Sequence, residues 1–285
     1  MVDAATLPRA LAAGIAVAAE AGLHVEAADV LTNSNRLTLR LRPCDVLARV
    51  APRARRDGAE FDVEIARRLA VSGAPVETLD PRVEPRVYEH DDFVVTLWTY
   101  YETVPPHDIA PAEYACALGR LHDRMRQAGL MDSPHFTDRI EEARRLVDDA
   151  TDHPWISGPD RALVAATLRQ MRSTVIERGA PEQLLHGEPH PGNVLRSKDG
   201  LLFVDLETCC RGPVEFDIAH ATISADRSPM EVAAHYTGAD QSLVYACWIL
   251  ALAMVTAWRC DPADDLPNGR ALAMDWIRQL RAAVH

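Results

Sequence analysis

The segment from Gln183 to Asp217 constrains the fold most, because it interrupts a half of the chain that otherwise predicts helices. Short apolar runs in this segment alternate with Gly, Pro and charged residues. Helical patterns flank it over these ranges: Pro111 to Ala128, Thr137 to Asp149, Pro159 to Arg178, and Pro229 to the C-terminus. Catalytic groups concentrate on loops that a rigid scaffold positions. A functional site is therefore expected first in this segment.

The first hundred residues have a different pattern. Alternating leucines at positions 37, 39 and 41, a turn over 42–45 and a second apolar run over 46–50 predict a β-hairpin. Apolar spacing over 59–71 predicts a helix that ends at Ser72-Gly73. The β-branched and aromatic run Phe93 to Trp98 is typical of a buried strand. The change from strands to helices indicates a boundary near Tyr100 to His107.

Two apolar segments resemble, respectively, a signal peptide and a membrane span. Ala10 to Ala19 resembles the core of a signal peptide, but Asp3 precedes it and Glu20 follows it, which favours a helix of the folded protein. Ser242 to Trp258 has no charge and is at the short limit for a membrane span. A buried core helix is the favoured interpretation of this second segment.

A family resemblance appears in the string from His186 to Asn193, in the apolar strand that ends at Asp205, and in the run from Gly212 to Ala219. These elements resemble the aminoglycoside phosphotransferase and choline-kinase-like family, whose loop HGDxxxxN is followed by a strand ending in Asp and by G-x-x-x-x-D-L-A. The resemblance implies an α+β, two-lobed protein-kinase-like fold. Its small β-rich, nucleotide-binding lobe would span residues 1–100, and its larger, mostly helical, catalytic and substrate-binding lobe would span residues 101–285.

The resemblance also implies roles for four residues. Phosphoryl transfer needs positioned groups that neutralise spreading negative charge, so two acids and an amide oxygen suffice. Glu188 corresponds to the carboxylate that orients the acceptor hydroxyl, while Asn193 and Asp205 correspond to the ligands of Mg²⁺ beside ATP or GTP. Glu207 either helps to hold the metal or faces solvent. His186 and Asp217 are expected to hold the catalytic-loop backbone.

The nucleotide-binding residues follow from the same resemblance. The family expects a cation on a small-lobe strand paired with a helix glutamate, and the chain's one lysine, Lys198, lies far downstream. The expected pair is therefore Arg49 with Glu64, with Glu60 as a substitute. The nucleotide loop is expected at Thr32-Asn33-Ser34-Asn35-Arg36, with Ser34 and Asn35 as donors. The hinge that contacts adenine is expected at Leu97 to Tyr101, with Trp98 and Tyr100 as its aromatic residues.

Two departures from the family pattern concern activity. Glu188 stands where the family has aspartate, which adds one methylene to a group whose placement matters for catalysis. No glycine lies between Val30 and Val50, where glycines usually let backbone N–H groups approach phosphates. These departures keep an alternative open, namely a catalytically weak kinase-like protein that binds a nucleotide or small molecule.

Other enzyme classes fit the string less well. His186-Gly187-Glu188 matches the H-x-E element of zinc deaminases, but adjacent Cys209 and Cys210 do not reproduce the P-C-x-x-C ligand pair. A helical metal pair of His186 with His190 is excluded because glycines and prolines forbid a helix there. The G-x-S-x-G elbow of many serine hydrolases is absent from the sequence.

Charge and cysteine content limit partners and location. A formal charge of −12 disfavours nucleic acid and anionic membranes as partners. Six scattered cysteines without framework spacing indicate reduced thiols and a cytoplasmic protein. The expected acceptor is a hydroxyl of a small molecule, preferably an aminoglycoside-like or other cationic compound. Acidic residues considered as its lining are Asp226, Glu231, Asp240, Asp261, Asp264 and Asp265, and Trp248, Trp258 and Trp276 are either stacking or core residues.

Overall fold

In a computed structural model, the chain forms two compact units. The sheet unit comprises Met1–Pro106 and Leu195–Glu207, and the helical unit comprises His107–Val194 and Thr208–His285. The expected lobes differ from these units in residues 101–106 and in residues 195–207, which belong to the sheet unit. The structure describes residues 3, 5–34, 36–103, 109–129, 132–149, 155–223, 228–262, 264 and 266–284.

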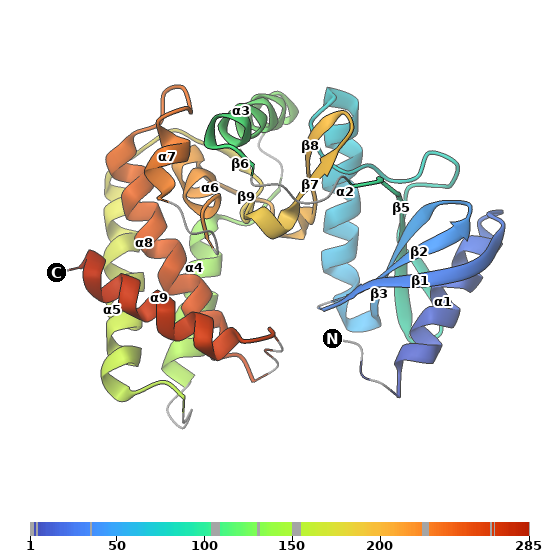
Figure 1. The fold of residues 1–285 in the computed structure, drawn as a ribbon, viewed down its shortest axis with the longest axis horizontal. Coiled ribbons are helices and arrows are strands. Elements are labelled where there is room, and N and C mark those ends of the chain that lie inside the picture. Colours follow the sequence, from blue (N-terminus) through green and yellow to red (C-terminus); the bar gives the residue numbers. More distant parts are fainter. Residues whose placement is uncertain are drawn as a thin grey trace. The chain divides into compact units, whose positions relative to one another are not determined.

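The sheet unit is built on a five-stranded antiparallel sheet with strand order β1-β2-β3-β5-β4 (Figure 1). A β7–β8 hairpin from the later segment completes this unit. Its elements are α1 (Leu7–Glu20), β1 (Val25–Asn33), β2 (Leu37–Pro43), β3 (Val46–Pro52), η1 (Arg53–Arg55), α2 (Arg56–Ser72), β4 (Tyr88–His90), β5 (Phe93–Thr99), β7 (Val194–Ser197) and β8 (Gly200–Phe203). The predicted hairpin, helix and buried strand are all present, and the predicted N-terminal helix is α1.

One face of the sheet is apolar and packs against α1. Successive strand residues point to opposite faces, so alternate positions of β2 and β3 supply this core. Leu39, Ala48 and Val50 are fully buried there. Gly14 of α1 lies so close that a Cβ at this position would be 2.9 Å from a methyl group of Leu39. The helix therefore fits tightly against the sheet.

The opposite face of the sheet carries polar residues and lies near α2. Arg49 and Ala51 of β3 and Thr96 and Trp98 of β5 are the intervening positions of the same strands. Thr96 pairs with Arg49 across the two strands. Helix α2 contacts β5 and ends at Gly73, whose φ of 66° is the left-handed conformation that glycine adopts readily. This face positions the charged groups of the candidate site.

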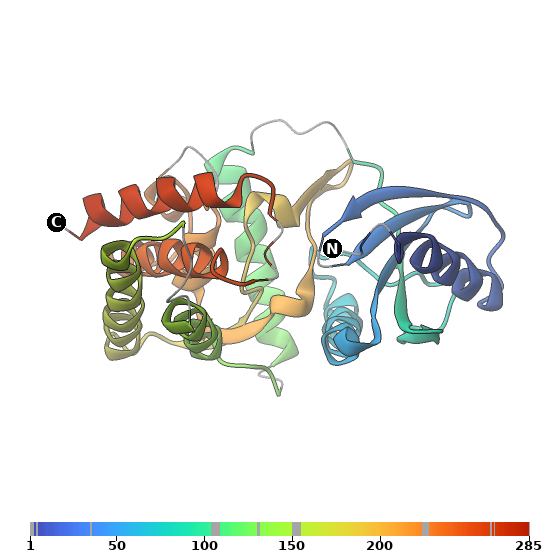
Figure 2. The same cartoon turned by 90° about the horizontal axis from the view of Figure 1, so that it is seen from below.

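The helical unit has α8 at the centre of its core. Helix α8 begins at the side chain of Asp240, which accepts hydrogen bonds from the N–H groups of Ser242 and Leu243. The unit's elements are α3 (Pro111–Ala128), α4 (Phe136–Asp149), α5 (Gly158–Glu177), β6 (Glu182–Leu185), η3 (Pro191–Asn193), β9 (Cys210–Pro213), α6 (Val214–His220), α7 (Pro229–Ala233), α8 (Gln241–Trp258) and α9 (Gly269–Ala283). The short turn η4 (Leu206–Thr208) has its first two residues in the sheet unit and its last in the helical unit. Figure 2 shows α5, α8 and α9 side by side.

Among the described residues, α8 is the one helix whose length and hydropathy would allow it to cross a membrane. Of that apolar window, 72% is buried inside the protein. It contacts α4, α5, α6, α7 and α9, and residues along it are fully buried in the helical core. Its position agrees with the core helix that the sequence predicts, because its apolar surface is already covered by other helices.

Two short strands hold the catalytic-loop segment in the helical unit. Strand β6 pairs antiparallel with β9, and Leu185 lies opposite Cys210 in this ribbon. The loop 186–193 leaves the end of β6, and α6 follows directly after β9. The ribbon therefore brings the residues after Leu185 close to α6, although about thirty residues separate them in the sequence.

Candidate active site

The loop 186–193 is anchored by the buried carboxylate of Asp217 on α6. Asp217 Oδ2 accepts a hydrogen bond of 2.8 Å from the N–H of His186, and Oδ1 accepts one of 2.8 Å from the N–H of Gly187. His186 and Asp217 are both fully buried. The side chain of Thr208 also donates to the carbonyl oxygen of His186 at 3.0 Å. Asp217 thus has the loop-holding contacts that the resemblance implies for it.

Asp217 remains ionised in this buried position because several donors surround it. Burial raises the pKa of its carboxyl group, but the hydrogen bond and charge of His122 and the N–H of Gly187 outweigh this effect and lower the pKa overall. His122 Nε2 lies 2.9 Å from Asp217 Oδ2, and its Nδ1 lies 2.7 Å from the hydroxyl oxygen of Tyr236. A chain of polar contacts therefore links α3, α6 and the loop.

Only glycine fits at position 187. Its φ is 89°, and a Cβ there would lie 2.0 Å from the carbonyl oxygen of Thr208. The tight approach of these two backbones is what lets the loop turn immediately after β6. The Gly187 of the sequence string therefore has a structural cause as well as a family resemblance.

Asn193 lies within the same loop as Glu188 and contacts its backbone. Asn193 Nδ2 donates a hydrogen bond of 3.0 Å to the carbonyl oxygen of Glu188, and its N–H donates to the carbonyl oxygen of His190 at 2.8 Å. The structure therefore brings the expected base and the expected metal-binding amide together. Because Nδ2 is engaged in this bond, the amide oxygen is the Asn193 atom that suits a metal ion.

The carboxylate of Glu188 is paired with an arginine that the sequence did not reveal. Arg139 of α4 donates from Nη2 to Glu188 Oε1, and its guanidinium lies 5.1 Å from the ring centroid of Trp258. Its Nη1 is buried without a hydrogen-bond partner among the described residues. The helical spacing of α4 gives no indication of this pairing, because Arg139 and Glu188 are 49 residues apart in the sequence.

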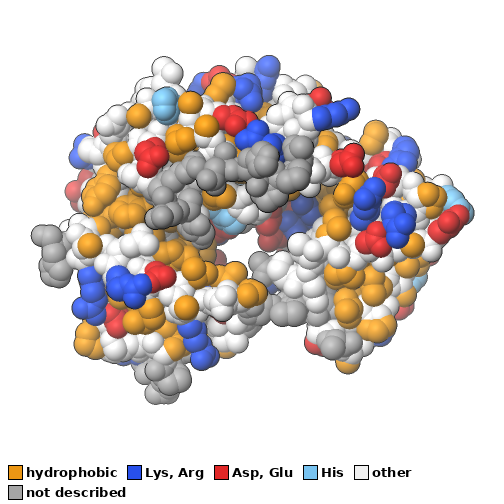
Figure 3. All heavy atoms as spheres, in the orientation of Figure 1, with side chains coloured by type: hydrophobic (Ala, Val, Ile, Leu, Met, Phe, Trp, Pro, Cys, Tyr) orange, Lys and Arg blue, Asp and Glu red, His pale blue; other side chains and the backbone are white. Residues whose placement is uncertain are grey.

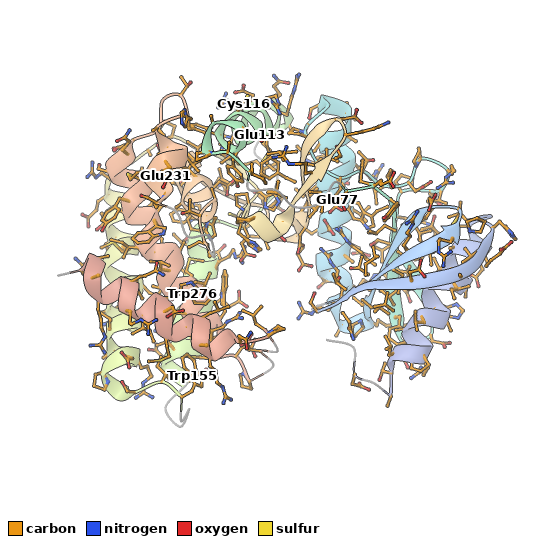
Figure 4. All side chains as sticks on the ribbon, viewed as in Figure 1. Glu77, Glu113, Cys116, Trp155, Glu231 and Trp276 are labelled. Carbon is orange, nitrogen blue, oxygen red and sulfur yellow. The ribbon has the colours of Figure 1, made fainter. Side chains whose placement is uncertain are left out.

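In the sheet unit, Arg49 is the buried cation that the sequence predicts on β3. Its two terminal nitrogens donate to the two carboxylate oxygens of Glu77 at 2.7 and 2.6 Å. Its guanidinium also lies 4.7 Å from the ring centroid of Trp98. Glu77, which Figure 4 labels, follows α2 and also accepts a hydrogen bond of 2.9 Å from the N–H of Asp205. Glu77 thus joins Arg49 to the backbone of the expected metal ligand.

The prediction that Glu64 pairs with Arg49 was wrong. Glu64 lies on the exposed face of α2, where it pairs with Arg67 and Arg68. Asp62 is instead the residue of α2 that faces Arg49, with 3.5 Å between Asp62 Oδ2 and Arg49 Nη1. Two residues along a helix correspond to a rotation of roughly 200°, so Asp62 and Glu64 point to nearly opposite sides. A signal existed, since Asp62 lies on the stripe that carries Ile65 and Leu69.

Arg36, the residue before β2, joins three carboxylates of the sheet unit. Arg36 Nη1 lies 2.9 Å from Asp62 Oδ2 and 3.5 Å from Glu207 Oε2, while Nη2 lies 2.5 Å from Asp205 Oδ1. Burial lowers the pKa of Arg36, but the three carboxylates outweigh burial and raise it. Arg36 was expected only as the last residue of the nucleotide loop. Its charge, opposite the acids after β8, was not predicted.

Glu207 faces the same cluster instead of open solvent. The strand does not continue past Phe203, and residues 206–208 form a short 3-10 turn. Burial raises the pKa of Glu207, and the nearby carboxylates of Asp205 and Asp62 raise it further, against the effect of Arg36. A pocket in the sheet unit is lined by Arg36, Arg49, Ala51, Arg55, Ala59, Val94, Thr96 and Glu207.

The other expected nucleotide-binding residues lie as follows. Ser34 is exposed at the turn between β1 and β2, and Asn35 lies outside the described residues. The side chain of Trp98 is fully buried and donates from Nε1 to Thr96 Oγ1 at 2.8 Å, so it supports Arg49 and is not available to stack on adenine. Tyr100 is half-buried, and the guanidinium of Arg40 lies 4.1 Å from its ring centroid.

Comparisons with known proteins bear on the family and the fold of this chain. A sequence profile described as phosphotransferase enzyme family matches residues 27–248. This chain belongs to that phosphotransferase family. It is therefore a phosphotransferase of the small-molecule kinase type, and the α+β fold with an N-terminal five-stranded sheet is kinase-like. A comparison with curated proteins finds no match.

Solved structures similar to this phosphotransferase support the fold. A choline/ethanolamine kinase family protein from Mesorhizobium loti is 18% identical, with a TM-score of 0.68, over 98% of this chain and 95% of that one. An amicoumacin kinase in complex with AMP-PNP and Ca²⁺ is 13% identical, with a TM-score of 0.71, over 97% and 96%. Wild-type aminoglycoside 2'-phosphotransferase-IIIa with GDP is 12% identical, with a TM-score of 0.66, over 94% and 97%.

The residues of the phosphotransferase's sheet unit fit a divalent cation. Kinases of this family use a nucleotide and a divalent metal ion. Asp205 and Glu207 supply hard oxygen donors, and Asp62 Oδ1 is a buried oxygen without a hydrogen-bond partner among the described residues. Among the described residues, no group of three or more His, Cys, Asp or Glu side chains is placed to hold a metal ion. Asp205 and Glu207 are thus a pair of donors and not a complete cage, as is common for Mg²⁺.

Three of the acidic residues considered for a cationic acceptor, Glu231, Asp240 and Asp264, have structural roles. Glu231, labelled in Figure 4, completes the capping box of α7 with Ser228, and Asp240 caps α8. Asp264 pairs with Arg259 at 2.9 Å. Asp226 and Asp265 lie outside the described residues. Figure 3 shows basic and acidic side chains interspersed on the face in view, so no continuous acidic surface appears there.

The three tryptophans of the later helices also differ in role. Trp276 of α9, labelled in Figure 4, is buried in the core of the helical unit. Trp248 is partly buried and packs against that core. Trp258 packs against the core and also carries the guanidinium of Arg139 over its ring. Trp258 is therefore the tryptophan associated with the candidate site, through Arg139.

Proposed function

We propose that this phosphotransferase transfers the γ-phosphoryl group of ATP to a hydroxyl group of a small molecule. Glu188 would orient the hydroxyl and accept its proton, while Asn193, Asp205 and Glu207 would hold Mg²⁺. The observation that carries the proposal is the closed catalytic loop, in which Asp217 binds two backbone N–H groups and Asn193 binds the carbonyl oxygen of Glu188. Such preorganisation is what a loose phosphoryl-transfer transition state requires of a protein.

Arg49 would serve as the cation for the nucleotide phosphates. The ion pair with Glu77 and the contact with Trp98 hold its guanidinium in one place. A planar, permanently charged fork can replace the lysine that many kinases use, because phosphate oxygens accept two parallel hydrogen bonds from it. Backbone atoms of 97–101 and the exposed Ser34 remain the proposed contacts to the rest of the nucleotide.

For the acceptor, we propose an amine-bearing alcohol as the first class to test. This proposal rests on the names of two similar solved structures, one of which refers to choline or ethanolamine and the other to an aminoglycoside. No separate support for a cationic acceptor comes from Glu231, Asp240 and Asp264, because they bind other groups. Arg139 beside Glu188 disfavours acceptors that carry a cation directly next to the reacting hydroxyl.

The test is ADP release by purified protein with Mg-ATP and a panel of aminoglycosides, macrolides, choline, ethanolamine and sugars. A thermal-shift screen with and without Mg-ATP selects compounds first, because a ligand of the folded state raises the melting temperature. Asp205→Asn should lose acceptor-dependent ADP release. Asp199→Asn, an exposed aspartate in the turn between β7 and β8, is the matched control and should retain it. Retained release by Asp205→Asn would refute the assignment.

A second function has a specific observation in its favour. Both Glu188 and Asp205 are paired with arginines, which neutralises the two acids that catalysis requires. A protein that binds a nucleotide or small molecule without efficient turnover would show this feature. Ligand-dependent thermal shifts without ADP release on any acceptor would support that function.

We propose the cytoplasm as the location of the protein. All six cysteines are free, and four of them are buried, which suits a reducing compartment. Fractionation of cells that express the full chain, followed by detection of the protein, tests this location. Recovery in a membrane or extracellular fraction would contradict it.

A further inference from the structure

Arg36 lies in a cluster of acidic side chains of the sheet unit. This cluster contains four carboxylates, those of Asp62, Glu77, Asp205 and Glu207, and two guanidinium groups. Arg49 is engaged in a two-oxygen pair with Glu77. Arg36 is the cation that Asp205, Glu207 and Asp62 share.

The carboxylates held by Arg36 are accessible to a solute. The side chains of Asp205 and Glu207 are 31% and 24% exposed, whereas the side chain of Asp62 is 1% exposed. Arg36 itself is 13% exposed. An ion from solution can therefore reach Asp205 and Glu207, while Asp62 keeps Arg36 attached to α2 from the buried side.

The backbone of Asp205 is held ready in an uncommon conformation. Its φ of 71° lies in the left-handed region, which non-glycine residues seldom adopt and which is found more often at functional sites. The hydrogen bond from its N–H to Glu77 stabilises this conformation without involving its carboxylate. The carboxylate can therefore exchange its partner while the backbone of Asp205 stays in place.

We propose that Arg36 holds the carboxylates of Asp205 and Glu207 when no metal is bound and competes with a divalent cation for them. Once displaced, the guanidinium binds the nucleotide phosphates, together with Arg49 of the same pocket. Two cations cannot share these carboxylates at contact distance without strong repulsion. Arg36 thus couples metal binding to nucleotide binding. The inference rests on the proposed function, because it assigns metal binding to Asp205 and Glu207.

The first test measures Mn²⁺ binding to the full-length protein without nucleotide, by electron paramagnetic resonance of free Mn²⁺. Arg36→Gln removes the competing charge and should increase Mn²⁺ affinity about tenfold, which corresponds to about 1.4 kcal/mol. Arg55→Gln removes an exposed arginine from the rim of the same pocket and is the matched control. It should change the affinity less than about twofold, because an exposed charge is screened.

The second test measures ATP binding by isothermal titration calorimetry in the presence of Mg²⁺. Arg36→Gln should weaken ATP binding about tenfold, while Arg36→Lys, which keeps the charge, should weaken it less. Opposite changes in Mn²⁺ and ATP affinity are the signature of exchange. An arginine with only a structural role would not tighten metal binding on removal.

Several results would overturn the inference. They are unchanged or weaker Mn²⁺ binding by folded Arg36→Gln, an equal gain in Arg55→Gln, or no Mn²⁺ binding by any variant. If Arg36→Gln does not fold, the double variant Arg36→Gln/Asp62→Asn avoids an unpaired buried carboxylate and should still show the gain in Mn²⁺ affinity. Because neither test measures phosphoryl transfer, the exchange can be established even if no acceptor is ever phosphorylated. Conversely, phosphorylation of an acceptor can be established even if Arg36 does not exchange with a metal ion.

Discussion

Arg139 donates a hydrogen bond to the carboxylate of Glu188 in the loop that carries the proposed chemistry. The contact bears on the glutamate that stands where the family has aspartate. An additional methylene gives the side chain more freedom, and a guanidinium held over Trp258 restricts that freedom. Arg139 therefore acts as a positioning residue for Glu188.

Substitution of Arg139 should separate positioning from charge. Arg139→Gln should lower kcat about tenfold with a smaller effect on the KM for ATP, because Glu188 loses its fixed orientation. Arg139→Lys should retain more activity, since it keeps a cation beside Glu188. The measurement is acceptor-dependent ADP release over pH 6 to 9. An Arg139→Gln enzyme with the kcat and pH profile of the wild type would show that the ion pair has no role in turnover.

Removing the charge of Glu188 and removing that of Asp205 should impair different steps, turnover in the first case and Mg-ATP binding in the second. Glu188→Gln should abolish turnover while Mg-ATP binding stays within about twofold of the wild type, because the acid acts on the acceptor. Asp205→Asn should weaken Mg-ATP binding itself, because it removes a ligand of the metal. Calorimetry of ATP binding with and without Mg²⁺ distinguishes the two variants. Wild-type turnover by Glu188→Gln would mean that another group accepts the proton.

The sequence predicted most of the fold because periodicity and end signals are local. Helix α3 begins and ends where its pattern does, and Gly73 ends α2 as expected. Apolar alternation likewise identified the β2–β3 hairpin and β5. Two strands were not fully predicted. The part of β1 before Val30 has no fully buried residue, and β4 has only three residues, so neither shows a clear apolar alternation. The assignment of 195–207 to the sheet unit depends on tertiary pairing, such as that of Val76 with Phe203.

The candidate site was predictable where one short string carries it and less so where distant segments meet. His186 to Asn193 and Asp205 were identified from contiguous residues. The partner of Arg49 was not, because the choice between Asp62 and Glu64 depends on the rotation of α2, and Glu77 lies in an irregular segment with no periodic pattern. Arg139 was missed, and so was the pairing of Arg36 with the acids, because only the folded chain brings these arginines to the carboxylates.

The glycine of the catalytic loop should be much more sensitive to substitution than another glycine with a similar φ. Gly187→Ala places a Cβ 2.0 Å from a backbone oxygen and should reduce the free energy of unfolding by about 3 kcal/mol or more. Gly179→Ala, at φ 59° with no atom within 4 Å of its Cβ, should cost about 1 kcal/mol and serves as control. Urea denaturation of both variants tests this. Equal losses would show that the close approach to Thr208 is unimportant.

His220 should make the helical unit less stable as the pH falls below neutrality. Burial lowers the pKa of this fully buried histidine below its usual 6.5, so the folded state binds its proton less readily than the unfolded state. The stabilisation is complete above pH 6.5 and is lost as the pH falls towards the lowered pKa. His220→Phe keeps a ring beside Phe216 and removes this proton linkage. Between pH 7.5 and 5.5, urea denaturation should show that the free energy of unfolding falls more for the wild type than for the variant. Because the other histidines are common to both proteins, equal losses would mean that His220 takes up its proton as readily in the folded state as in the unfolded chain.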